Sequence, residues 1–235
     1  MAQDEHAAHY DGFARAYSAE NESNLYNAVY ERPAMLELAG DVGGLRVLDA
    51  GCGSGPLTAA LAARGAFVAG FDQSAAMVDL ARARLGGGAD LRVADLADPL
   101  PYADAQFDLV TASLVLHYLE DWAGPLAELR RVLEPGGRLL VSVNHPAILP
   151  FLEPDRDYFA LTRIAEDHLF DGETVWLTFW YRPLHAMADA FARAGFLIRG
   201  IGEPPPAPDT PAEMLTGLEP TGKFICFVFF DLQAA

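Results

Sequence analysis

The sequence predicts one α/β domain over residues 1–235, built on a mainly parallel sheet with helices on both faces. Two observations lead to this fold class. Short apolar runs alternate with segments of helical spacing, which is the pattern of βαβ units. The 235 residues are 51% hydrophobic and 21% charged, which is enough for one well-buried core and short for two domains.

Seven apolar runs are expected to be the strands. In chain order they are Arg46–Ala50, Phe67–Phe71, Leu91–Ala94, Phe107–Leu116, Arg138–Val143, Phe196–Ile201 and Phe224–Asp231. A Pro-rich stretch rather than a clear crossover helix separates the last two runs, so we expect this pair to be antiparallel.

Four segments with helical spacing are expected to be the helices between strands. They are Pro56–Arg64, Ser74–Leu85, Gly124–Leu133 and Pro183–Ala194. Pro56 and Pro183 suit first-turn positions, because the missing N–H would be unpaired there anyway. Gly65 and Gly195 suit helix exits, where a positive φ is common.

Two regions fall outside this alternation. Residues 1–40 are expected to form helices before the first strand. Residues 144–182, between the fifth and sixth strands, form a long insertion with many aromatic side chains: Phe151, Tyr158, Phe159, Phe170, Trp176, Phe179, Trp180 and Tyr181. A hydrophobic patch packed on the main core would explain them, but long insertions are often lids, and we expect a cap over the active site.

The charge balance excludes several partners. The net charge is −17 and the sequence pI is about 4.5, so nucleic acids and anionic membranes are not expected to bind. The N-terminal residues include no apolar run typical of a signal peptide, and Phe224–Phe230 is too short to span a bilayer. A cytoplasmic location is therefore expected. Cys52 and Cys226 are too few for a disulfide framework and are expected to be buried free thiols.

The strongest local signal is the run from Val47 to Gly55, where an apolar strand leads into a glycine turn and then a helix. Glycines let the backbone approach a ligand closely, and the helix N-terminus offers free N–H groups. The spacing is G-x-G-x-G, which differs from the G-x-G-x-x-G of dinucleotide-binding loops. For this motif alone, a tight turn without a ligand stays an alternative.

Asp72 ends the second expected strand, at the carboxyl edge where open α/β sheets bind ligands. A carboxylate there accepts hydrogen bonds from both hydroxyls of a ribose; the alternative is an N-cap for the helix that follows. Asp95 and Leu96 end the third strand in the same way. Met77 lies one turn into the helix after Asp72, where a methionine is by itself more often core than ligand contact.

These residues, in order, resemble the signature series of the class I S-adenosylmethionine-dependent methyltransferases, in the branch that methylates small molecules. The matching elements are Asp49-x-Gly51-x-Gly53-x-Gly55, Asp72, Asp95-Leu96, Phe107-Asp108-Leu109-Val110 and Arg131-Val132-Leu133-Glu134-Pro135-Gly136-Gly137. The resemblance covers residues 10–144 and also fits the last two strands. It implies a Rossmann-like sheet of seven strands whose last strand is antiparallel.

The resemblance also implies a cofactor, S-adenosylmethionine, which leaves as S-adenosylhomocysteine. Asp49 would orient the glycine loop, and the Gly51 backbone would meet the methionine part. Asp72 would hold the ribose, while Asp95 and Leu96 would hold the adenine.

An N-terminal helical lid, also implied by the resemblance, would bring aromatic or basic side chains to the cofactor carboxylate. The cofactor contacts expected from all these elements are Tyr10, Tyr17, Arg32, Asp49, Ala50, Gly51, Gly53, Asp72, Gln73, Met77, Asp95, Leu96 and Ser113.

Methyl transfer from a sulfonium is an in-line displacement, so a base helps only when the acceptor must lose a proton. His117, after the fourth strand on the ligand side, is the first candidate base; a structural histidine is an equal alternative. His145, after the fifth strand, is the second, and turn chemistry also explains it. Tyr181 is the third, although ordinary packing is the commoner role for such a residue.

No metal site is expected. Beyond Asp49, Asp72 and Asp95 no acidic cluster converges, and His6 and His9 resemble a metal pair only by spacing.

The aromatic cap indicates a flat or apolar small-molecule acceptor, methylated at carbon, nitrogen or oxygen, whereas an acidic interior would favour an amine. A monomer or homodimer is expected. Two other functions stay open: a nicotinamide-dinucleotide oxidoreductase, which also has a glycine turn and a later acid, and a methyltransferase-like binding protein without turnover. The glycine spacing counts against the first, and the intact Asp72 against the second.

Overall fold

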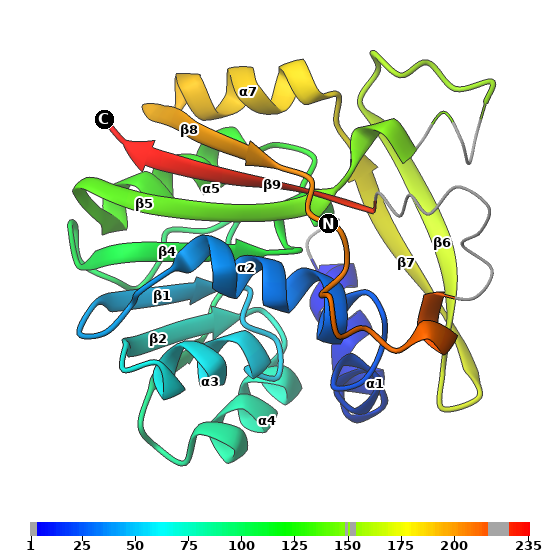
Figure 1. The fold of residues 1–235 in the computed structure, drawn as a ribbon, viewed down its shortest axis with the longest axis horizontal. Helices are drawn as coiled ribbons and strands as arrows, with labels where there is room; N and C mark the ends of the chain where they lie inside the picture. The colour runs from blue at the N-terminus through cyan, green and yellow to red at the C-terminus, as the bar shows by residue number, and fades with distance from the viewer. Residues whose placement is uncertain (1–3, 149, 151–153, 216–225) are drawn as a thin grey trace.

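A seven-stranded sheet forms the centre of the protein, in the order β3-β2-β1-β4-β5-β9-β8 (Figure 1). The computed structural model describes residues 4–148, 150, 154–215 and 226–235, with side chains from Tyr10 onward. The strands are β1 (Arg46–Ala50), β2 (Phe67–Asp72), β3 (Asp90–Val93), β4 (Phe107–Ser113), β5 (Leu133–Asn144), β8 (Phe196–Gly202) and β9 (Phe227–Ala234). The first five run parallel, whereas β9 is antiparallel to both β5 and β8, which confirms the predicted fold class.

Side chains along the central strands alternate between two hydrophobic layers. Val47 and Leu109 pack on one face of the sheet, whereas their chain neighbours Leu48 and Val110 pack on the other. This alternation follows from the period of two along a strand, and both faces are apolar because helices cover both.

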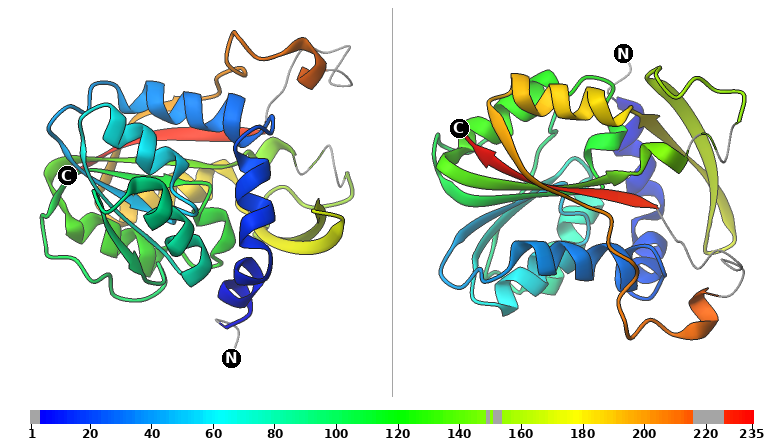
Figure 2. Two further views of the ribbon diagram at one scale, coloured as in Figure 1. Left: turned by 90° about the horizontal axis from the view of Figure 1, so that it is seen from below. Right: turned by 45° about the horizontal axis from the view of Figure 1, so that its top comes forward.

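Two pairs of helices make the outer layers (Figures 1 and 2). The helices α2 (Arg32–Ala39) and α3 (Pro56–Ala63) cover one face, and α5 (Ala123–Val132) and α7 (Leu184–Arg193) cover the other. A further helix, α4 (Ala75–Leu85), packs beside α3 and along β2 and the edge strand β3.

The N-terminal helix α1 (Asp4–Asn21) lies beyond the carboxyl ends of the parallel strands (Figure 1). It bends at Phe13, whose φ of −135° is not helical. A π-helical turn, η1 (Asn27–Glu31), follows and leads into α2. This segment therefore covers the sheet edge at which ligands bind in such folds.

The insertion after β5 contains a hairpin of two long strands, β6 (Thr162–Phe170) and β7 (Glu173–Tyr181). These strands were not predicted from the sequence. Asp171 and Gly172 connect them, with φ values of 50° and 82°. Two consecutive positive φ values are the geometry of a tight hairpin turn, and Asp-Gly is a preferred sequence for it.

Several element ends differ from the predictions. The fourth strand ends at Ser113 rather than at Leu116, because Leu114 has a φ of 50° that a strand does not accommodate. The fifth strand begins earlier than predicted, at Leu133. Phe224, the predicted start of the last strand, lies outside the described residues, as does Phe151 of the insertion.

Short 3-10 segments complete the chain: η2 (Leu116–Tyr118), η3 (Pro146–Ile148) and η4 (Ala212–Leu215). Both cysteines are free, but only Cys52 is buried as predicted, and Cys226 is half-buried. In the described part of the chain, none of the helices has the length and apolar character needed to span a membrane.

Candidate active site

The glycine loop between β1 and α3 forms the floor of a cavity at the carboxyl edge of the sheet. Gly51, Gly53 and Gly55 have φ values of 71°, 53° and 80°. A Cβ on Gly51 would lie 2.6 Å from Cγ2 of Val115, whereas one on Gly53 would meet open space. The loop backbone therefore borders the cavity directly, and only glycine fits at position 51.

Asp72, at the end of β2, is fixed by two backbone donors. Gly53 N donates to its Oδ2 and Ser74 N donates to its Oδ1, both at 2.9 Å. Burial raises the pKa of the Asp72 carboxyl against the effect of these two bonds. The N-cap of α4 is Ser74, whose Oγ accepts from Met77 N. The capping alternative for Asp72 is thus set aside, and its carboxylate lines the cavity.

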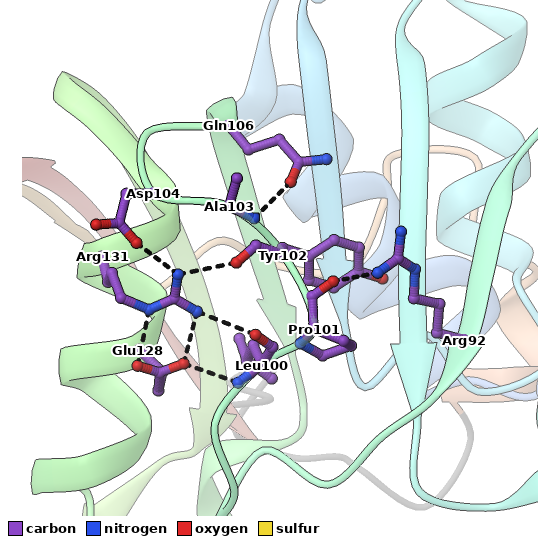
Figure 3. Close-up of polar contacts among 9 residues, drawn as sticks. All are labelled: Arg92, Leu100, Pro101, Tyr102, Ala103, Asp104, Gln106, Glu128 and Arg131. Carbon is purple, nitrogen blue, oxygen red and sulfur yellow. Dashed lines mark hydrogen bonds and ion pairs between the residues drawn. The ribbon is translucent and has the colours of Figure 1, made fainter.

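The loop between β3 and β4 is held by a network around one arginine (Figure 3). Arg131 Nη2 donates to Leu100 O at 3.0 Å and to Glu128 Oε2 at 2.8 Å. Its Nη1 donates to Tyr102 O at 2.8 Å and to Asp104 Oδ1 at 2.7 Å. Glu128 Oε2 also accepts from Leu100 N at 2.7 Å. These contacts fasten the loop to α5.

The start of the same loop reaches the cavity through Asp95 and Leu96. Ala97 N donates to Asp95 Oδ1 at 2.8 Å, which orients the carboxylate. Leu96 is 5% exposed, and Met77 and Phe71 line the cavity beside it. This end of the cavity offers a polar edge next to an apolar wall, which suits a flat polar ring system.

Helix α1 is fastened to the residues that surround the cavity. Ser74 Oγ and Ala76 N donate to Asp11 Oδ1, and Ser18 Oγ donates to Ser54 Oγ in the glycine loop at 2.8 Å. The N-terminal helix thus contacts the same loops that carry the predicted ligand contacts.

Tyrosine side chains from α1 and η2 face the cavity. The hydroxyls of Tyr10 and Tyr118 are hydrogen bonded, and the rings of Tyr10 and Tyr17 pack edge to face with centroids 5.2 Å apart. Burial raises the pKa of all three phenols, that of Tyr17 to about 12. They are neutral hydrogen-bonding groups at physiological pH. Leu177 and Thr178 of β7 complete this side of the cavity.

Two buried carboxylates line the cavity near the end of β1. Asp49 accepts from Thr58 Oγ1 at 2.6 Å and from Thr111 Oγ1 at 2.8 Å. Glu31, in η1, accepts from Ser113 Oγ at 2.7 Å and from Ser142 Oγ at 2.6 Å. Burial raises the pKa of Asp49 to about 6 and that of Glu31 to about 7.

Most of the predicted cofactor contacts lie around this one cavity. The predicted residues that line it are Tyr10, Tyr17, Arg32, Asp49, Gly51, Gly53, Asp72, Gln73, Met77, Asp95, Leu96 and Ser113. Ala50 is the exception: its side chain is fully buried and packs in the hydrophobic layer with Leu48 and Leu116.

His117, the first candidate base, does not line the cavity. It is 4% exposed, and its Nδ1 accepts from Asn144 N at 3.3 Å. The ring packs against Tyr118 and Phe179, with centroids 4.7 and 5.1 Å away. Burial lowers the pKa of His117 to about 3, so the imidazole is neutral and only weakly basic. This arrangement is that of a structural histidine, the alternative to a catalytic base.

The other two candidate bases also lie away from the cavity. His145 is 7% exposed; its Nδ1 accepts from Ala147 N at 3.1 Å, and its Nε2 is 2.6 Å from Glu203 Oε1. Tyr181 is buried, and its hydroxyl donates to Glu166 within the hairpin at 3.1 Å. Their side chains hold the insertion and the turn after β5 rather than facing the ligand space.

The aromatic residues expected to contact an acceptor are also placed differently. Trp176 is 58% exposed on the hairpin, and neither it nor Trp180 lines the cavity. The rings that do line it, besides Phe71, are those of Tyr10, Tyr17 and Tyr118.

Other cavity residues were not predicted at all, above all Glu31 with Asn21 and Asn27. No local motif marks Glu31, because its partners are far away in the chain; an acidic residue beside Arg32 in the predicted lid was the only available signal. Within the described part of the chain, no three His, Cys, Asp or Glu side chains gather as metal ligands would. The side chains of His6 and His9 lie outside the described ones.

Comparisons with known proteins identify similar methyltransferases. The sequence profile of the methyltransferase domain family matches residues 48–141. The chain is 36% identical over 173 residues to the ubiquinone/menaquinone biosynthesis C-methyltransferase of Desulfotalea psychrophila, a match that covers 68% of each protein. It is 39% identical over 158 residues to the demethylmenaquinone methyltransferase of Clavibacter sepedonicus, covering 65% of this chain and 63% of that protein.

A solved structure is also similar. The S-adenosylmethionine-dependent methyltransferase from Mesorhizobium loti superposes with a TM-score of 0.62 at 28% identity. The superposition covers 86% of this chain and 95% of that chain. The likeness therefore extends well beyond the residues that the domain profile matches.

Proposed function

Since the chain belongs to the class I S-adenosylmethionine-dependent methyltransferases, we propose that it transfers the methyl group of S-adenosylmethionine to a small-molecule acceptor. One observation carries the proposal. A single cavity at the carboxyl edge of the sheet collects the glycine loop, Asp72, Asp95 with Leu96, and Arg32. Each of these groups has a counterpart in that molecule. The glycine loop would meet the methionine part, Asp72 the ribose diol, Asp95 with Leu96 the adenine, and Arg32 the α-carboxylate.

The cofactor contacts follow from the donors and acceptors present. The two oxygens of Asp72 each accept one backbone N–H, and their remaining lone pairs would accept from the ribose hydroxyls. Asp95 would accept from the adenine amino group, and Leu96 and Met77 would contact the ring. Arg32, whose Nη2 donates to Asn21, would bind the α-carboxylate through its remaining N–H groups in a charge-assisted hydrogen bond.

The acceptor would lie in the part of the cavity lined by Tyr118 with Leu119 and by the hairpin residues Leu177 and Thr178. These walls are apolar with a few hydroxyls, which favours a flat, mostly apolar ring. The Clavibacter and Desulfotalea relatives act, by their names, on quinone precursors. We infer an aromatic acceptor of phenol or quinol type for this chain.

Catalysis is proposed to rest on alignment and exclusion of water. S-adenosylmethionine supplies a methyl group on a sulfonium, which becomes a neutral thioether when the methyl bonds to the acceptor. Among the described residues no imidazole faces the cavity, and the phenols of Tyr10 and Tyr118 have raised pKa values, so neither is a base near neutral pH. The chain's task is to hold the nucleophilic atom in line behind the methyl group. The acceptor's own acidity or nucleophilicity then decides which atom is methylated.

The test is a two-step measurement on the purified protein. Calorimetry with S-adenosylmethionine and S-adenosylhomocysteine is expected to show binding that Asp72→Ala weakens, with no binding of nicotinamide dinucleotides. Transfer of a labelled methyl group to a panel of phenols, quinols, amines and aliphatic acids is then followed by mass spectrometry. Labelling of the phenols or quinols supports the proposal.

Two results would count against it. No binding of either adenosyl compound would remove the proposed activity altogether. Binding without transfer to any acceptor in the panel would favour the binding protein without turnover.

A further inference from the structure

The carboxylate of Glu31 is buried in the cavity wall with its hydrogen bonds arranged on one side. The residue is 3% exposed. Ser113 Oγ and Ser142 Oγ, from the ends of β4 and β5, both donate to Oε1. Within the described parts of the chain, Oε2 accepts no hydrogen bond. One oxygen is thus fixed by the protein, and the other is available to a ligand in the cavity.

No protein cation pairs with this carboxylate in the described structure. The groups around it are the Asp49 carboxylate on β1, the Tyr17 phenol on α1 and the Arg32 guanidinium on α2. Of these, only Arg32 is cationic, and its Nη2 donates to Asn21 O and Oδ1, both at 2.8 Å. Two buried carboxylates on one cavity without a paired cation are costly when ionised. That cost falls when a cation enters the cavity.

The neighbouring Arg32 supplies the opposite charge. Glu31 and Arg32 are adjacent in sequence, at the junction of η1 and α2, and both line the cavity. Glu31 lies at the ends of β4 and β5, across the sheet edge from Asp95 after β3, and Arg32 adds a cation to the same cavity. An anion and a cation on one cavity suit a group that carries both charges. The methionine part of the proposed cofactor is such a group, with an α-ammonium and an α-carboxylate.

We propose that Glu31 binds the α-ammonium group of S-adenosylmethionine through Oε2, while Arg32 binds the α-carboxylate. This inference rests on the proposed function and adds to it a residue that reads the amino-acid end of the cofactor. Ser113 and Ser142 are positioning residues, because their hydroxyls orient the carboxylate.

The sulfonium is the other cation that the carboxylate could meet, and ligand chemistry separates the two. S-adenosylhomocysteine keeps the α-ammonium and lacks the sulfonium charge. 5′-Methylthioadenosine keeps the adenosine and the thioether and lacks the amino acid. Loss of a contact to the ammonium therefore weakens the binding of S-adenosylmethionine and S-adenosylhomocysteine alike and leaves the binding of 5′-methylthioadenosine unchanged.

The experiment compares the wild type, Glu31→Gln and Glu37→Gln by calorimetry with all three ligands at pH 7.5. Glu37 lies exposed on α2 six residues away and serves as the matched control. Glu31→Gln keeps the shape and the acceptor for both serines but removes the charge. We expect its dissociation constants for S-adenosylmethionine and S-adenosylhomocysteine to rise by roughly 10- to 100-fold, the range for losing a hydrogen bond between charged groups. Binding of 5′-methylthioadenosine is expected to stay within twofold, and Glu37→Gln to match the wild type.

Each other outcome overturns the inference. Unchanged affinity of Glu31→Gln for S-adenosylmethionine removes the contact. Equal weakening of 5′-methylthioadenosine makes the residue structural, and weakening confined to S-adenosylmethionine assigns it to the sulfonium. If the wild type itself binds no adenosyl ligand, the proposed function fails as well; in the first three cases it stands.

A pH series gives a second readout. Ionisation of Glu31 is required for the contact, so wild-type affinity for S-adenosylhomocysteine is expected to rise from pH 5.5 to 7.5. Asp49 also titrates in this range and contributes to the slope. Glu31→Gln is expected to flatten the profile, and a profile identical to the wild type would contradict the assignment.

Discussion

Removal of the Glu31 charge is expected to stabilise the protein in the absence of cofactor at neutral pH. Burial raises the pKa of Glu31 from 4.5 to about 7, so the native state holds a proton that the unfolded chain has already lost. A carboxyl whose pKa is raised in the native state contributes stability that is fully present below pH 4.5. That stability is lost as the pH rises from 4.5 to about 7. Each pKa unit corresponds to about 1.4 kcal/mol, which limits the loss to roughly 3 kcal/mol.

The assay is urea unfolding of the cofactor-free wild type, Glu31→Gln and Glu37→Gln between pH 5.5 and 8.5. Near pH 5.5 position 31 is uncharged in both native proteins, and this pH is one unit above the pKa of the unfolded glutamate, so the variant is expected to be more stable by only about 1.4 kcal/mol. Above pH 7.5 the difference is expected to reach about 3 kcal/mol, since ionised Glu31 is buried without a paired cation. Glu37→Gln is expected to follow the wild type at every pH.

Two results would refute this reasoning. A stability difference that does not change with pH would mean that Glu31 does not titrate in this range. A wild type that gains stability relative to Glu31→Gln as the pH rises would mean that a cation already pairs with it in the empty protein. Saturating S-adenosylhomocysteine is expected to reverse the order at pH 8, because the ligand supplies the missing cation.

Asp72→Ala is expected to weaken cofactor binding roughly 100-fold, measured by calorimetry, because it removes two charge-assisted hydrogen bonds; unchanged affinity would contradict the ribose assignment. Gly51→Ala places a Cβ 2.6 Å from a Val115 methyl at a φ of 71°, so cofactor binding and the melting temperature are both expected to fall; a variant that matches the wild type would show that the loop is not constrained. Arg131→Ala is expected to lower the free energy of unfolding by about 1–2 kcal/mol through lost loop hydrogen bonds, and to increase hydrogen exchange in the loop after β3; unchanged exchange would argue against the anchoring role. His117→Ala is expected to cost roughly 2–4 kcal/mol of stability in urea unfolding, as large-to-small core changes do, while the pH dependence of turnover keeps its shape; a lost limb in that profile would restore His117 as a base.

The presence and the parallel direction of the first five strands were predictable because they leave local patterns in the sequence. Buried parallel strands such as Arg46–Ala50 are short apolar runs, and the helices between them have proline entries and glycine exits. The hairpin of β6 and β7 was not predicted, because charged residues interrupt Thr162–Phe170 and hide its alternation. Its clearest signal is the Asp171-Gly172 pair between two nine-residue segments.

The candidate site also contains residues that were predictable from the sequence and residues that were not. Asp49, the glycines and Asp72 follow strand ends, so their placement at one edge is a consequence of parallel topology. The burial of Glu31 arises instead from contacts with Ser113 and Ser142, which are 82 and 111 residues away. The spacing of nearby residues in the sequence does not predict such distant contacts. For the same reason, His117 follows β4 as expected but turns into the core, a choice that the packing of Phe179 against it decides.

A crystal structure of the protein grown with S-adenosylhomocysteine tests the central claim most directly. We expect the ribose hydroxyls within hydrogen-bonding distance of the Asp72 carboxylate, the adenine against Leu96, and the amino-acid end between Glu31 and Arg32. A ligand bound outside this cavity, or one seated in it with the nucleoside at the Glu31 end, would contradict the account.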